Sequence, residues 1–167
     1  MSFFRFFCAC TLLVALAACG FRPLYGRSEN YALTQELAHI SITSIEDRKG
    51  QIVHNFLLDR LNPNGRRADT RYTLKVSVSQ TTEEIGLKFT EEATRAKLTL
   101  IARYSLTRDT DGKVLAEGSV RSVNNYNISD SEFSRVASER DATERAAREV
   151  SDEIKTRLSL YFSLRGV

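Results

Sequence analysis

Side chains that could perform catalysis or bind a metal are few and scattered in this chain of 167 residues. The two histidines, His39 and His54, fall in a predicted strand and a predicted helix, and neither has a partner at metal-ligand spacing. The carboxylate pairs Glu83-Glu84 and Glu91-Glu92 flank a predicted hairpin turn, and nothing places an acid and a base across a cleft. We therefore expect no catalytic residues, no metal site and no cofactor, and interpret both histidines as structural.

One cysteine lies where its thiol would be modified. Arg5 is followed by an apolar run over residues 6–15, and Leu16-Ala17-Ala18-Cys19 places small residues before the cysteine, which is typical of an export signal with a cleavage site. The same four residues are similar to the bacterial lipobox, in which the cysteine is acylated and becomes residue one. The apolar run is shorter than the roughly 20 residues that span a bilayer. We expect a lipoprotein signal peptide over residues 1–18 and lipidation of Cys19.

The remaining residues have the composition of one globular domain. With 42% hydrophobic and 27% charged residues, the chain can bury a core after its signal is removed. Cys8 and Cys10 lie in the signal and Cys19 carries lipid, so the exported part has no disulfide. The formal charge of +3 falls to +2 when Arg5 is lost, which does not indicate a nucleic-acid partner.

The mature chain is predicted to begin with a tether. Residues 20–32 contain Pro23 and show no clear periodicity, so we expect an extended segment. We assign residues 19–36 to this lipidated tether and 37–167 to a single domain. A first strand is predicted between Leu37 and Ile45, and helical spacing of apolar residues predicts a helix over about 50–62 with Asp47 as its N-cap.

Three more strands and a long helix follow. Strict alternation from Tyr72 to Val78 predicts a strand that continues past a kink near Gly86 to Leu87 and Phe89. Return strands are predicted over 97–107 and 114–126, with turns at 91–94 and 109–112. A capping box of Ser129 and Glu132 begins a helix that runs to about residue 162. Its predicted apolar stripe is Phe133, Val136, Ala137, Ala142, Ala146, Ala147, Val150, Ile154, Leu158 and Tyr161.

The order of these elements, β-α-β-β-β-α, predicts an α+β fold. Two helices should pack on one face of a four-stranded, mostly antiparallel sheet. By alternation, Arg95, Lys97 and Arg103 lie on the face opposite Leu98 and Leu100, away from the helices. Such a cationic surface can meet phosphates or a polar pore wall. It can equally be a solvated face whose charges prevent sheets from associating, and the sequence leaves both interpretations open.

Two segments near the ends of the mature chain resemble a known family. Cys19-Gly20-Phe21-Arg22-Pro23-Leu24-Tyr25-Gly26 looks like the acylated start of alphaproteobacterial LptE, the lipopolysaccharide-assembly lipoprotein family. Glu139-Arg140-Asp141-Ala142, with Arg145-Ala146-Ala147 after it, is similar to the C-terminal helix of that family. The middle of the chain matches only in the order of its elements.

The resemblance implies an outer-membrane lipoprotein, anchored by its lipid and facing the periplasm, whose domain plugs the LptD barrel and helps deliver lipopolysaccharide to the cell surface. Gly20 fits this location, because the inner-membrane retention signal is an aspartate there. Arg95 and Lys97 are our hypothesis for lipopolysaccharide contact, made from the hairpin alone. The alternative is a lipid-anchored periplasmic accessory protein of another transport or envelope-maintenance complex, without a barrel partner.

Overall fold

The computed structural model describes residues 27–63, 65, 69–85, 94–129 and 131–165. Helix α2 (Arg27–Leu37) is followed by strand β1 (Ile40–Ile42) and helix α3 (Asp47–Leu61). Three long strands come next, β2 (Tyr72–Ile85), β3 (Thr94–Arg108) and β4 (Val114–Ile128), and helix α4 (Glu132–Ser163) ends the fold. Residues Ala32–Val167 form one compact unit.

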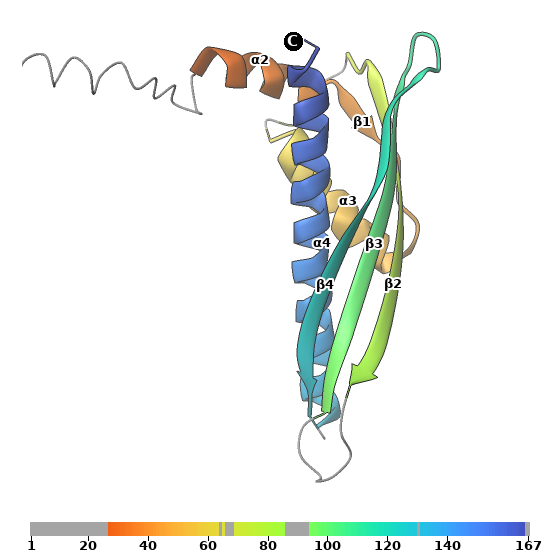
Figure 1. Ribbon diagram of the computed structural model, residues 1–167, viewed down its shortest axis with the longest axis vertical. Coiled ribbons are helices and arrows are strands. Elements are labelled where there is room, and N and C mark those ends of the chain that lie inside the picture. Colours follow the sequence, from red (N-terminus) through yellow and green to blue (C-terminus); the bar gives the residue numbers. More distant parts are fainter. Residues whose placement is uncertain (1–26, 64, 66–68, 86–93, 130, 166–167) are drawn as a thin grey trace, which may run out of the picture. The chain divides into compact units, whose positions relative to one another are not determined.

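The four strands form one sheet in the order β1-β2-β3-β4. β1 runs parallel to β2, whereas β2 with β3 and β3 with β4 are antiparallel. Helices α3 and α4 lie on the same side of this sheet (Figure 1). The predicted α+β architecture is therefore confirmed, with the short helix α2 as an addition.

The core lies between the sheet and its helices. Alternate β3 residues from Ala96 to Leu106 are buried, as are Leu74 of β2 and Val120 of β4. They face the buried sides of both helices, which include Val53 and Leu57 of α3. The buried apolar residues of α4 are Ala142, Ala146, Ala147, Val150, Ile154, Leu158 and Phe162.

The expected extended conformation is wrong for residues 27–32, because Arg27–Leu37 form α2. This stretch contains no proline or glycine, and Leu33 and Leu37 lie four residues apart on one side of the helix, where they pack against the core. The hydroxyl of Tyr72 donates a 2.8 Å hydrogen bond to Glu36, which also lies 3.5 Å from the Arg71 guanidinium. The tether predicted over 20–26 lies outside the described residues.

Two helix starts differ from their predictions. Glu46, with an extended backbone, is the N-cap of α3, and Asp47 is instead its first residue, with a φ of 71°. Ser131 is the N-cap of α4, so Ser129 and Glu132 do not form a capping box. Glu132 is the first residue of that helix and pairs with Arg135 at 2.5 Å. Both helices nonetheless occupy the predicted stretches of sequence.

The apolar stripe of α4 was predicted too long at its beginning. Phe133 is 84% exposed and Val136 is 56% exposed, whereas the stripe from Ala142 to Leu158 is buried as predicted. The predicted first strand is also shorter than expected, because only Ile40–Ile42 pair with β2. The predicted kink at Gly86, the strand through Leu87 and Phe89, and most of the turn at 91–94 lie outside the described residues.

Candidate functional site

The face of the sheet that points away from α3 and α4 is the candidate functional surface, and we call it the outer face. Strand pairing fixes its rows, because residues paired across neighbouring strands point to the same side. Reading from the end near residue 85, the rows of β2, β3 and β4 are Ile85–Arg95–Asn127, Glu83–Lys97–Asn125, Thr81–Thr99–Val123, Ser79–Ile101–Arg121, Ser77–Arg103–Ser119 and Lys75–Ser105–Glu117. Hydroxyls and long cationic side chains dominate these rows.

Positive charge on the outer face exceeds negative charge. Two carboxylates, Glu83 and Glu117, accompany the five cations Lys75, Arg95, Lys97, Arg103 and Arg121 in these rows. Glu83 pairs with Lys97 at 2.5 Å, and this hydrogen bond lowers the pKa of the Glu83 carboxyl. Within the described residues, the other four cations make no ion pair. The outer face is therefore a positively charged surface rich in hydroxyl groups.

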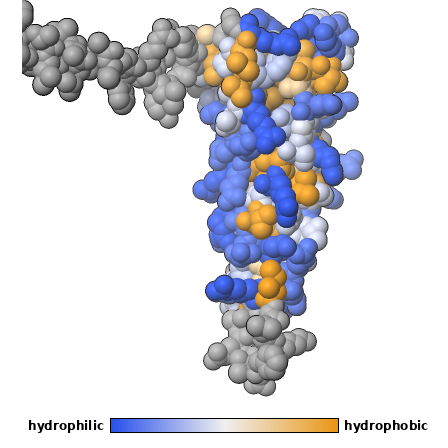
Figure 2. Space-filling model, viewed as in Figure 1, coloured by the Kyte–Doolittle hydropathy of each residue, from blue (hydrophilic) through white to orange (hydrophobic). Residues whose placement is uncertain are grey.

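The helical surface has a different electrostatic character. Its basic and acidic residues pair with each other along α4, as Arg140 with Glu144 and Arg157 with Glu153 do. The Arg60 guanidinium of α3 also donates two hydrogen bonds to the Asp152 carboxylate of α4, from Nε to Oδ1 at 2.5 Å and from Nη2 to Oδ2 at 3.0 Å. In the view of Figure 2, which shows α4 beside the edge of the sheet, hydrophilic residues cover most of the described surface and apolar residues form separate patches. The charges of the helical side largely compensate one another, and those of the outer face do not.

Polar contacts between α4 and β4 hold the sheet that carries this surface. Ser122 donates a 2.5 Å hydrogen bond to Glu149, and Asn124 donates to Ser122 at 2.8 Å. Nearer the C-terminus of α4, the Arg157 guanidinium donates to the carbonyl of Ser119 at 3.1 Å. Because Ser119 lies on the free edge of β4, this contact fixes the edge strand onto the helix.

The structure confirms the predicted placement of Arg95, Lys97 and Arg103 on the face away from the helices. The three residues differ in exposure, in ion pairing and in their position along β3. Arg95 is exposed and lies opposite Ile85 and Asn127, while Lys97 is half-buried and paired with Glu83. Arg103 lies six residues from Lys97, about 20 Å along the strand. Sequence reasoning missed Lys75 and Arg121, although strand alternation with the correct pairing of the strands would have found both.

The other residues singled out from the sequence have no part in this surface. Cys19 lies outside the described residues. His39 is buried, and its Nδ1 lies 2.7 Å from the carbonyl of Asp69, while His54 is half-buried on α3. Among the described residues, no group of histidine, cysteine and carboxylate side chains could hold a metal ion. None of the described helices is long and apolar enough to cross a lipid bilayer.

Comparison with known proteins identifies the family. The model of the LptE family, described as lipopolysaccharide assembly, matches residues 37–158. The chain belongs to this family. The family that the resemblance implied is thus confirmed by a match that covers the sheet, α3 and most of α4. The similar segment at residues 19–26 lies outside the matched residues.

Individual relatives agree with this assignment. An uncharacterized protein of Rickettsia prowazekii is 26% identical over 151 residues, which cover 90% of this chain and 93% of that protein. A candidate lipoprotein of Caulobacter crescentus has a similar structure, with a TM-score of 0.69 at 20% identity over 81% of this chain and 98% of that one. Rare lipoprotein B of Shewanella oneidensis has a TM-score of 0.56 at 14% identity, covering 75% and 98% of the two chains. At these identities the two structures share the fold with this LptE family member.

Proposed function

We propose that this protein is an outer-membrane lipoprotein, lipidated at Cys19 and facing the periplasm, that supports and plugs the LptD barrel during lipopolysaccharide assembly. It acts by binding and not by catalysis. Family membership supports a role in lipopolysaccharide assembly. The lipobox at residues 16–19 supports the anchor. The identity of the barrel partner is inferred from family membership.

One observation supports the binding role most strongly, namely the uncompensated positive charge of the outer face. Lipopolysaccharide carries phosphate groups on its lipid A, and charge-assisted hydrogen bonds from guanidinium and ammonium groups to phosphate are strong. Arg95 is exposed at the end of the outer face near residue 85 and makes no ion pair with another described residue. Lys97, in the adjacent row, is already paired with Glu83. Arg95 should therefore contribute more to phosphate binding than Lys97.

The chemistry of the outer face also suits a plug. The inner wall of a membrane barrel is polar, so a protein inside it must present hydroxyl and charged groups rather than an apolar face. Rows such as Ser77–Arg103–Ser119 have this character. The compact core beneath them needs no partner for its burial, because the helices already cover the other side of the sheet.

Lipopolysaccharide binding by the full lipoprotein in detergent tests the proposal. The double variant Arg95→Ala with Lys97→Ala should weaken binding at least fivefold without lowering the unfolding midpoint. The matched control is Lys49→Ala with Lys155→Ala, which removes two exposed cations from the helices and should leave binding unchanged. Equal binding by the wild type and the outer-face variant would contradict the proposed ligand site.

A further inference from the structure

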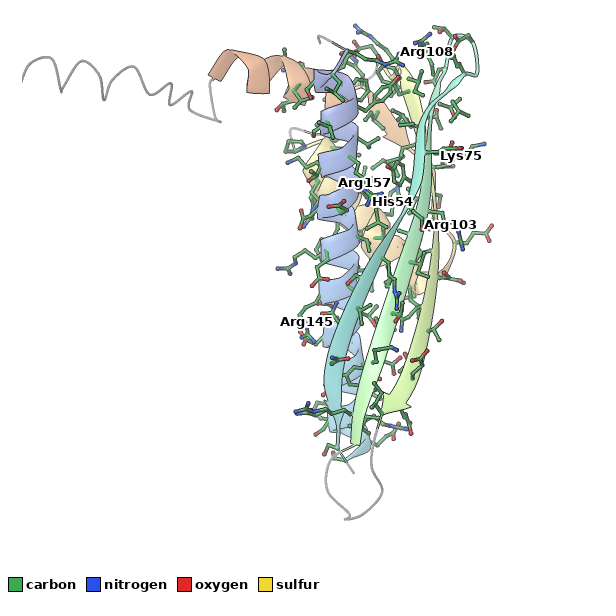
Figure 3. All side chains as sticks on the ribbon, viewed as in Figure 1. His54, Lys75, Arg103, Arg108, Arg145 and Arg157 are labelled. Carbon is green, nitrogen blue, oxygen red and sulfur yellow. The ribbon has the colours of Figure 1, made fainter. Side chains whose placement is uncertain are left out.

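The part of the outer face farthest from residue 85 carries two cations that the proposed ligand site does not use. Lys75 of β2 and Arg103 of β3 lie in adjacent rows, and both are exposed. Figure 3 shows their side chains extending from the sheet on the side away from α4. Arg95 is eight residues from Arg103 along β3, a separation of about 27 Å in a strand. The two groups of cations are therefore too far apart to hold one phosphate.

Short side chains lie opposite these two cations on the neighbouring strands. In the strand register Arg103 lies opposite Ser77 of β2 and Ser119 of β4, and Lys75 lies opposite Ser105 of β3. The long side chains thus rise above their neighbours and can reach groups on a facing surface, while the serine hydroxyls can bond to polar groups that come closer. Glu117, at the far side of the Lys75 row, makes no ion pair with either cation among the described residues.

The shape of this region favours a protein surface as its partner. Sites for small ligands are concave, and two hollows of about 400 and 370 Å³ in this protein are lined by residues of α3 and α4 only. The region around Lys75 and Arg103 is a sheet surface three strands wide, and neither of these two hollows lies on it. Spaced cations on such a surface match carboxylates that are spread over a second surface, and this kind of complementarity determines the choice of partner.

We propose that Lys75 and Arg103, with the serines beside them, form a docking surface for a protein wall that presents aspartate and glutamate side chains. This inference rests on the proposed function, in which the wall belongs to the barrel partner. It divides the outer face into two parts: the end near Arg95 binds lipopolysaccharide, and the part around Lys75 and Arg103 binds protein. The two activities should be separable by substitution.

The test combines two measurements on the same proteins. The variant Lys75→Glu with Arg103→Glu is purified in detergent from cells, the barrel that accompanies it is quantified, and its binding of purified lipopolysaccharide is measured. The control Lys49→Glu with Lys155→Glu makes the same change of charge on the helices. The docking variant should retain at least tenfold less barrel and unchanged lipopolysaccharide binding. At 0.15 M salt the screening length is about 8 Å, so its charges should not act on Arg95 from a distance. Thermal unfolding should show that both variants are folded.

Each result has a defined meaning. Retention of the barrel by the docking variant at the wild-type level would overturn the docking surface and leave the proposed function intact. Loss of lipopolysaccharide binding with the barrel retained would also overturn it, because the surface around Lys75 and Arg103 would then be a ligand site. If the wild-type protein itself brings no barrel, the proposed function fails, and the docking surface fails with it.

Discussion

The ring of Tyr104 on β3 lies directly across the backbone of Gly118 on β4. A Cβ atom built at Gly118 would lie 3.0 Å from the Tyr104 hydroxyl and 3.2 Å from two ring carbons. The two residues are paired across the strands, and Tyr104 is almost fully buried there. Tyr104 also interacts with Arg157 of α4, and together with the larger effect of Glu153 it raises the pKa of the Arg157 guanidinium. A side chain at position 118 would thus force the Tyr104 ring to shift.

Gly118→Ala should destabilise the protein by about 1–3 kcal/mol, because the added methyl group displaces the Tyr104 ring and weakens its contact with Arg157. In an open strand position the same change would be neutral or stabilising, since alanine reduces the entropy of the unfolded chain. Urea unfolding measures the difference. Ser119→Ala, at an exposed neighbouring position, is the control and should change stability by less than about 0.5 kcal/mol. A stabilised Gly118→Ala variant would show that the ring does not occupy this space.

Asp152→Asn should lower the free energy of unfolding at pH 7 by less than about 1 kcal/mol, because the Arg60–Asp152 pair that joins α3 to α4 is only partly shielded from water. The hydrogen bond from Arg60 lowers the pKa of Asp152. A carboxyl whose pKa is lower in the folded protein than in the unfolded chain stabilises the fold at every pH above its unfolded pKa, which is near 3.9. This stabilisation is lost as the pH falls through the lower pKa of the folded protein.

Urea unfolding of the wild type and Asp152→Asn between pH 7 and pH 2.5 measures this contribution. The two proteins should differ at pH 7 and converge below about pH 4. Arg60→Gln should show the same convergence, because it removes the other partner. A constant difference across the whole pH range would mean that the ion pair is not the cause.

Phe133→Ala should leave the unfolding midpoint almost unchanged, since this side chain is 84% exposed at the beginning of α4. Leu158→Ala, on the buried part of the same helix, should cost about 2–5 kcal/mol because it opens a cavity in the core. Urea unfolding of both variants compares the two positions directly. A loss of similar size for both would restore the longer apolar stripe predicted from the sequence.

Periodicity alone determined much of the fold in advance. Alternation placed Leu98 and Leu100 on the buried side of β3 and Arg103 on the outer side, and all three lie there. Residues whose environment depends on other parts of the chain were not predictable in this way. Phe133 fits the helical stripe by its spacing, but its exposure is set by tertiary structure and not by its position in the stripe. The same limit explains why α2 was not expected from the sequence. This short helix is supported by the packing of Leu33 and Leu37 against the core, and not by local propensity alone.

The same limit applies to the candidate site. The sequence indicated that Arg95 and Lys97 share a face, but not that Glu83 neutralises one of them, because the pairing of β2 with β3 decides which carboxylate lies opposite Lys97. Lys75 was overlooked for a similar reason. It belongs to a different strand from Arg103 and becomes its neighbour only through that pairing.

Glu83→Gln should tighten lipopolysaccharide binding about two- to fivefold, because it frees the Lys97 ammonium group from its carboxylate partner. Glu117→Gln removes one negative charge from the opposite end of the outer face and is the matched control. Titration of each purified lipoprotein with lipopolysaccharide at 0.15 M salt measures the change. An equal gain for both variants would show a general charge effect and would argue against a specific role of Lys97.

The most direct test of the whole account is purification of the tagged wild-type lipoprotein from detergent-solubilised membranes, with mass spectrometry of the proteins that accompany it. The account predicts an outer-membrane barrel protein in a stoichiometric amount. Recovery of only soluble or inner-membrane partners would contradict it, and would favour an accessory lipoprotein of another envelope complex.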